Sequence, residues 1–321
     1  MTIRARDYLP RHVIATTDPN NNEPTTFEFE RILGEGGEGV AALYISSDRV
    51  RVTVKVQYCN ETDPAQKGEE EANLAAQASA AIGSICTPKG CPNCTVKSSA
   101  IRVPMSTVKS GPCSFSIYPF FHFNLSDWIA ENPKRSPEMI ISLFEQALGI
   151  IICLRDKGYY YSDIKSSNFL VVQNDSSDLT PQLIVGDLGG IVTENSKSVQ
   201  LPTERLPPIL LKDFSWKKMD QITSFLLATL ALELVLRVPL ASDDSSPLDT
   251  FFSCLQETAT MTVDPDKCVE NVMRQLKGSL ASGLSLHSPL VQSIVATALN
   301  LMGYRKMYVK LSKIAGLIGT Y

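Results

Sequence analysis

Five short segments follow one another along this chain, and each carries groups suited to binding or transferring phosphate. They are a glycine-rich run at 33–40, a Val-Thr-Val-Lys strand ending at Lys55, an acidic stretch ending at Glu71, the run Tyr-Ser-Asp-Ile-Lys-Ser-Ser-Asn at 161–168 and the Asp-Leu-Gly at 187–189. Glycines let a backbone approach phosphate closely, a lysine neutralises its charge, and carboxylate and amide oxygens bind the accompanying metal. Together the segments predict a phosphoryl-transfer site assembled from distant parts of the chain.

The order and spacing of these segments resemble the signature set of the eukaryotic-type protein kinases, over residues 27–318. The resemblance implies an α+β, bilobal protein-kinase-like fold, in which a small antiparallel β-sheet lobe with one helix precedes a larger, mostly α-helical lobe. It divides the chain into an N-terminal arm at 1–26, a nucleotide-binding N-lobe at 27–119 and a catalytic and substrate-binding C-lobe at 120–321.

Local composition predicts the elements of these parts. Runs rich in β-branched and aromatic residues predict strands at 26–33, 39–45, 50–58, 100–105 and 114–119. Good helix formers predict a helix at 63–81, and an N-cap at Ser136 followed by Pro137 begins a second helix that ends near Gly158. Further helices are expected at 219–236, where the sequence is apolar nearly all round, at 290–302 and at 308–317.

The glycine-rich run fits G-x-G-x-x-G between two strands, whereas a dinucleotide fold would place it between a strand and a helix. Glycines also occur in plain hairpins, so the run by itself leaves that interpretation open. The resemblance implies that its residues cradle the triphosphate; these are Gly34, Glu35, Gly36, Gly37, Gly39 and Val40. It also implies that Ile117 is the gatekeeper and that Tyr118 and Phe120 present backbone groups to adenine.

Lys55 lies on a strand whose alternation places Val54 and Val56 on the opposite face. The resemblance implies that Lys55 contacts the α- and β-phosphates and pairs with a glutamate of the neighbouring helix. Glu71 is the preferred partner, because the apolar residues of that helix then face the sheet, and Glu70 is the alternative.

The run at 161–168 carries the strongest single signal. The resemblance implies that Asp163 accepts the proton of the substrate hydroxyl and that Lys165 neutralises the transferring phosphoryl group. It further implies that Asn168 and Asp187 hold magnesium through hard oxygen ligands. A lysine two residues after the aspartate is usual in the Ser/Thr members of the family.

These assignments predict an ATP-dependent Ser/Thr protein kinase that transfers the γ-phosphoryl of Mg-ATP to protein hydroxyls. Several departures leave two alternatives open, a pseudokinase that acts as a nucleotide-binding or scaffolding module and a small-molecule phosphotransferase. Tyr161 and Ser162 replace the usual His and Arg, and Glu38 places a negative charge at the tip of the glycine-rich run. Asp220 is expected to hold the backbone of the catalytic run, and Arg305 lacks its usual glutamate partner.

Composition restricts the partners and the location. A net charge of -4 argues against nucleic acid, since no basic stripe is available to displace its counterions. The N-terminus lacks the long apolar run of a signal peptide, and the longest apolar stretch, at 225–236, is too short and too close to charged residues to span a bilayer. No membrane partner is therefore expected, and the location is predicted to be intracellular, cytoplasmic or nuclear.

Eight cysteines in such a location are expected to be thiols. Cys86, Cys91 and Cys94 cluster, however, and zinc binding or a disulfide remains an alternative there. Three clustered cysteines leave a zinc ion one ligand short unless Cys59 or Cys113 supplies the fourth.

Overall fold

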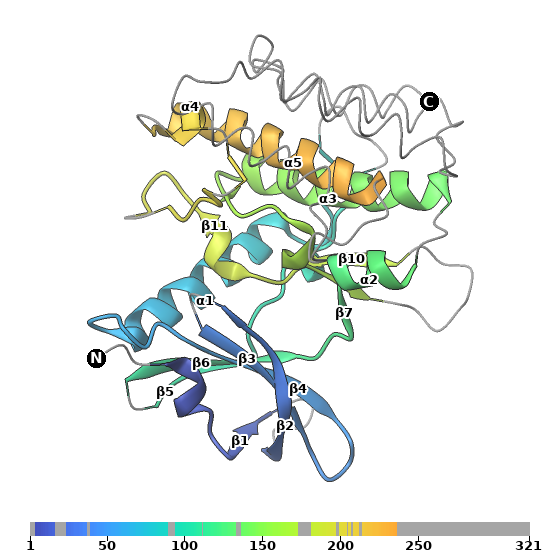
Figure 1. Cartoon of the computed structure of the whole chain (residues 1–321). Helices are drawn as coiled ribbons and strands as arrows, with labels where there is room; N and C mark the ends of the chain where they lie inside the picture. The colour runs from blue at the N-terminus through green and yellow to red at the C-terminus, as the bar shows by residue number, and fades with distance from the viewer. Residues whose placement is uncertain are drawn as a thin grey trace. The chain divides into compact units, whose positions relative to one another are not determined.

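The structure is a computed structural model, and it describes residues 4–16, 24–36, 39–88, 94–110, 112–132, 136–172, 181–196, 199–203, 205–206, 208–211 and 214–235 (Figure 1). The chain divides into two compact units, one made of Met1–Ala80 and Ile101–His122 and the other of Ala81–Ala100 and Phe123–Tyr321. The helices predicted at 290–302 and 308–317 lie outside the described residues.

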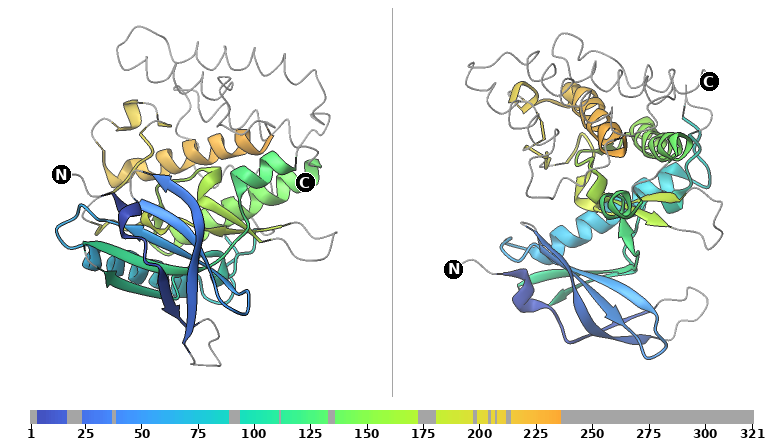
Figure 2. Two further views of the ribbon diagram at one scale, coloured as in Figure 1. Left: turned by 60° about the horizontal axis from the view of Figure 1, so that its bottom comes forward. Right: turned by 45° about the vertical axis from the view of Figure 1, so that its right-hand side comes forward.

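The first unit is built on one antiparallel sheet with the strand order β1-β2-β3-β4-β6-β5 (Figures 1 and 2). Its strands are β1 His12–Ala15, β2 Thr25–Gly36, β3 Gly39–Ile45, β4 Arg51–Gln57, β5 Ser106–Ser110 and β6 Cys113–Pro119. The strand predictions at 26–33, 39–45, 50–58 and 114–119 are confirmed. The strand predicted at 100–105 is wrong, because the next strand, β5, begins only at Ser106.

A hydrophobic cluster covers one face of this sheet. Val52, Val54 and Val56 of β4 alternate into it beside Phe27 and Tyr44, as expected for a strand with one face in a core. The 3-10 helix η1 Ala5–Tyr8 leads to Leu9, which packs against the cluster. The Tyr44 hydroxyl donates a hydrogen bond to the Pro10 carbonyl at 2.6 Å, so the residues predicted as an arm include structure that packs on the sheet.

Helix α1 Pro64–Ile82 packs near β5 and β6 (Figure 2). Ala75 and Ala78 of this helix are fully buried. Gly68 comes so close to β6 that a Cβ there would lie 1.9 Å from the Ser114 hydroxyl oxygen. The helix prediction at 63–81 is therefore confirmed, and small residues allow its close approach.

The second unit contains two longer helices that contact each other, α3 Pro137–Asp156 and α5 Met219–Val235. As predicted, the Ser136 hydroxyl caps α3 by accepting a hydrogen bond from the Met139 amide at 3.2 Å, and α5 is largely buried. The other elements are η2 Ser98–Ala100, β7 Phe123–Asn124, α2 Leu125–Glu131, β8 Tyr160–Tyr161, η3 Ser166–Asn168, β9 Phe169–Val172, β10 Gln182–Val185, η4 Leu188–Gly190, β11 Ile191–Val192, α4 Pro208–Leu211 and η5 Trp216–Lys218. The strands pair as β10-β9-β7 and β11-β8.

The predicted fold class, a bilobal protein-kinase-like fold with a large helical lobe, is wrong. The strands that the structure describes all pair antiparallel: they form a six-stranded sheet in the first unit, enlarged by β1, and two small sheets in the second. Within the described part of the second unit only α3 and α5 exceed two turns. The prediction extended a resemblance between short motifs to a whole architecture, although site residues can be carried by unrelated folds.

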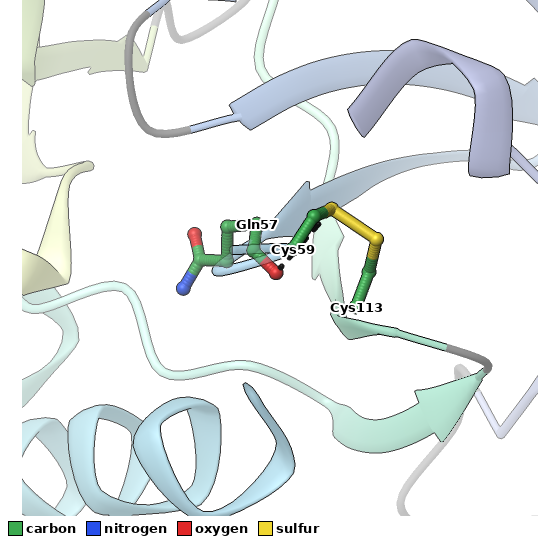
Figure 3. Close-up of a disulfide and its surroundings, with 3 residues drawn as sticks. All are labelled: Gln57, Cys59 and Cys113. Atoms are coloured by element: carbon green, nitrogen blue, oxygen red, sulfur yellow. Dashed lines mark hydrogen bonds between the residues drawn. A yellow bond between two sulfur atoms is a disulfide. The ribbon is translucent and has the colours of Figure 1, made fainter. Parts of the chain in front are cut away.

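Disulfides replace the expected thiols. Cys59, just after β4, is bonded to Cys113 at the start of β6, as Figure 3 shows. In the second unit Cys86 is bonded to Cys153 of α3, and Cys94 is also disulfide-bonded. The thiol prediction is therefore wrong for these residues, and Cys86 and Cys94 offer no thiolate to zinc.

Metal-binding groups and membrane-spanning helices are both absent from the described residues. No group of His, Cys, Asp and Glu side chains among them has the arrangement of a metal site. None of their helices is both long and apolar enough to cross a bilayer.

Candidate functional site

Two predicted side chains of the second unit, those of Lys165 and Asn168, contact Asp163 in the turn between β8 and β9. The Lys165 ammonium lies 2.7 Å from Asp163 Oδ2. The Asn168 amide nitrogen donates to the same oxygen at 2.7 Å and to the Asp163 carbonyl at 2.9 Å. The other carboxylate oxygen, Oδ1, is buried and has no hydrogen-bond partner among the described residues.

Pairing of β9 with β10 brings Asp187 close to Asn168. Phe169 pairs with Val185, and the Gly186 amide donates to the Asn168 carbonyl at 2.8 Å. Asp187 then caps η4, where its Oδ1 accepts a hydrogen bond from the Gly189 amide at 3.4 Å. Because Asn168 directs its amide nitrogen at Asp163, its oxygen faces elsewhere, and this oxygen and the Asp187 carboxylate are the hard donors that magnesium prefers.

The backbone after Asp187 lies against the turn that carries Asp163. A Cβ at Gly190 would come within 2.6 Å of the Tyr161 ring, so only glycine allows this approach. The Ser162 amide donates to the Gly190 carbonyl at 2.8 Å, and its hydroxyl donates to the Gln200 carbonyl at 2.7 Å. Ser162, for which the kinase resemblance implied an arginine, thus makes neutral hydrogen bonds to the segment that follows Asp187.

A residue that the sequence analysis missed holds the other side of this turn. Glu233 of α5 accepts a hydrogen bond from the Ser166 amide at 3.0 Å and pairs with Arg205. The role expected of Asp220 is therefore taken by Glu233, because Asp220 lies beside Arg155 instead, at 4.0 Å. A single acid within the apolar Leu-Ala-Leu-Glu-Leu stretch was the available signal, since acids are rarely buried without a partner.

In the first unit Lys55 and Glu71 are both directed to the α1 side of the sheet. Lys55 pairs with Ala41 and Ser116 in the sheet register, and its strand neighbour Gln57 donates to Glu71 at 2.9 Å. The Tyr58 hydroxyl also donates to Glu71. Glu71 is half-buried while Glu70 is exposed, and the pairing of Lys55 with Glu71 stays a prediction.

Two predicted nucleotide contacts fall on the wrong face of the sheet. Val40 and Ile117 are buried in the hydrophobic cluster, on the side away from Lys55. Their neighbours Ala41 and Tyr118 share the face of Lys55, because alternate residues of a strand point to opposite sides. Burial raises the pKa of Tyr118 to about 12, and the nearby Glu71 carboxylate adds to this rise while Lys55 opposes it.

The described residues of the glycine-rich run lie at the end of β2 and the start of β3, where Gly36 pairs with Gly39. A Cβ at Gly34 or Gly36 would meet nothing within 4 Å, and neither residue has a positive φ. Packing therefore does not require glycine at these two positions. Glu35 is exposed, Phe120 is half-buried beyond the end of β6, and Gly37 lies outside the described residues.

No protein-family model matches the sequence, and no curated protein matches it either.

Proposed function

We propose that this protein is an ATP-dependent Ser/Thr protein kinase that transfers the γ-phosphoryl of Mg-ATP to hydroxyls of protein substrates. One observation carries the proposal: Asp163 has one oxygen bound by Lys165 and Asn168, and a second, buried oxygen without a partner among the described residues. An unpaired buried acceptor costs free energy, so it persists where function uses it.

The geometry suits acceptance of a proton from an incoming hydroxyl. Lys165 and Asn168 fix the carboxylate through Oδ2 and leave Oδ1 for the substrate. A positioned general base contributes about 10²- to 10⁴-fold to a rate. Asn168 and Asp187 are the proposed magnesium ligands, and Mg-ATP, when bound, supplies the phosphoryl group and a metal charge that offsets its negative charge.

The test is transfer of radiolabelled γ-phosphate from Mg-ATP to casein by the purified, oxidised full chain. We expect transfer that EDTA abolishes and that Lys55→Met lowers about 10²-fold, because Lys55 is the proposed phosphate contact of the first unit. Lys157→Met, an exposed lysine at the end of α3, is the matched control and should retain full activity. A wild-type protein that transfers no label, or a Lys55→Met variant as active as wild type, would refute the proposal.

A binding module without turnover is the second candidate, and two hydrogen bonds to Glu71 favour it. Glu71, the proposed partner of Lys55, accepts hydrogen bonds from Gln57 and Tyr58. If these contacts persist with nucleotide present, the protein would bind Mg-ATP and gain thermal stability, because the ligand binds the folded state alone. Stabilisation by Mg-ATP together with no label transfer would support this candidate over the first.

The disulfides are informative about the cellular compartment of the protein. Disulfides persist in oxidising compartments and are rare in the cytosol, so the bonds of Cys59 with Cys113 and Cys86 with Cys153 favour an oxidising compartment over the predicted intracellular location. Alkylation of intact cells before lysis, followed by mass analysis, tests this. Cysteines that remain unmodified support the oxidising compartment, and modified cysteines support the cytosol.

A further inference from the structure

Each of the two carboxylate oxygens of Glu233 has a polar partner. Its side chain is only 4% exposed, and Oε1 lies 2.5 Å from a guanidinium nitrogen of Arg205. Oε2 accepts the hydrogen bond from the Ser166 amide. Ser166 is the first residue of η3, between Asp163 and Asn168, so Glu233 contacts the backbone of the turn that carries the proposed base and a proposed metal ligand.

A buried ion pair of this kind is weak evidence of a contribution to the stability of α5. The surrounding positions of the helix, such as Leu230 and Leu234, are buried and apolar. A buried carboxylate loses hydration, and a buried ion pair is often no more stable than well-packed apolar side chains. An acid at this position therefore points to a role that an apolar residue cannot perform, and accepting the Ser166 amide is such a role.

Arg205 connects the same residue to the segment that follows Asp187. That segment also contacts the Asp163 turn through Ser162, whose hydroxyl donates to the Gln200 carbonyl. The turn and the segment are thus joined at two separate places, by Ser162 and by the Glu233–Arg205 pair. Loss of either partner of the pair would leave a buried charge uncompensated.

We propose that Glu233 is a positioning residue for the proposed phosphoryl transfer: it holds the Asp163–Asn168 turn through the Ser166 amide, with Arg205 as its counter-ion. The inference rests on the proposed function. Positioning of this kind matters because small displacements of a reacting group lower rates steeply, about 10²-fold for 1 Å.

Two substitutions separate the hydrogen bond from the charge. Glu233→Gln keeps an oxygen that can accept from Ser166, whereas Glu233→Leu removes both the acceptor and the charge. We expect Glu233→Leu to lower kcat about 10²-fold with little change in the KM for ATP, and Glu233→Gln to retain more of the rate. Glu131→Leu, an exposed glutamate at the end of α2, is the control and should leave both constants unchanged.

The double variant Arg205→Leu/Glu233→Leu distinguishes a role of Glu233 in positioning the turn from a role in the stability of the fold. Removing both charges should restore much of the thermal stability lost in Glu233→Leu, because no unpaired ion remains buried. It should not restore kcat, since Ser166 still lacks its acceptor. Recovery of stability and kcat together would overturn the proposal.

Amide hydrogen exchange tests the contact without any turnover. Exchange in a peptide covering residues 161–170 should be faster in Glu233→Leu than in Glu233→Gln, because only the leucine variant releases the Ser166 amide. If the wild type transfers no phosphate, the proposed function is refuted. The exchange difference would even then support the hydrogen bond between the Ser166 amide and Glu233. Equal exchange in the two variants overturns the inference whether or not the protein is active.

Discussion

Replacement of Asp163 by asparagine is expected to lower the rate of phosphoryl transfer about 10³-fold while leaving the affinity for Mg-ATP nearly unchanged. Asparagine has the same shape, and its single carbonyl oxygen can accept the hydrogen bonds that Lys165 and Asn168 now make to Oδ2. The amide nitrogen then takes the place of the unpartnered Oδ1. The substitution therefore replaces a carboxylate oxygen that can accept a proton with an amide nitrogen that can only donate a hydrogen bond. The hydrogen bonds from Lys165 and Asn168 are kept.

The measurement is kcat and KM for ATP by the radiolabel assay, with the melting temperature as a check on folding. Asp156→Asn makes the same change at the end of α3, on a side chain that is 35% exposed, and should leave the rate unaltered. A rate for Asp163→Asn within a few-fold of wild type would show that Asp163 is not the base. Loss of the melting transition would instead show that the carboxylate is structural.

Removal of the Cys86–Cys153 disulfide is expected to lower the free energy of unfolding by about 4 kcal/mol. The bond joins residues 67 apart in the sequence, and the chain-entropy relation gives about 4 kcal/mol for a loop of this length. The bond ties the loop after α1 to a fully buried position of α3. The unfolded chain therefore gains freedom that the folded unit does not.

Urea unfolding of Cys86→Ala/Cys153→Ala against wild type gives this difference. Cys59→Ala/Cys113→Ala is the matched variant, because its residues are 54 apart and should give a similar loss. Reductant should destabilise wild type more than either variant, since each variant has one of these two bonds left to lose. Equal unfolding free energies for wild type and the Cys86→Ala/Cys153→Ala variant would contradict the expectation.

Local patterns predicted much of the chain. Alternation of valines around Lys55 marked β4, and Ser136 with Pro137 marked the start of α3, because strand alternation and helix caps depend on residues a few positions apart. The grouping of Asp163, Lys165 and Asn168 followed for the same reason, since all three belong to one turn. Motif spacing alone misplaced Val40 and Ile117, because an error of one residue changes the face of a strand.

The fold class and the disulfides were not predictable in this way. The fold class depends on how strands pair across the chain, including β1, whose short sequence gives little signal. Bonding of Cys86 to Cys153 depends on a loop meeting a helix far along the sequence. Short motifs and cysteine spacing contain neither kind of information.

The amino-acid sequence by itself determined the local elements and the chemical groups of the Asp163 turn, because both arise from residues close together in the chain. Only the tertiary structure decided that Glu233 holds this turn in place of Asp220, that Arg205 balances its charge and that one oxygen of Asp163 remains buried without a partner among the described residues. These contacts join residues from separate segments, and burial, which sets their energy, exists only once the segments have packed together.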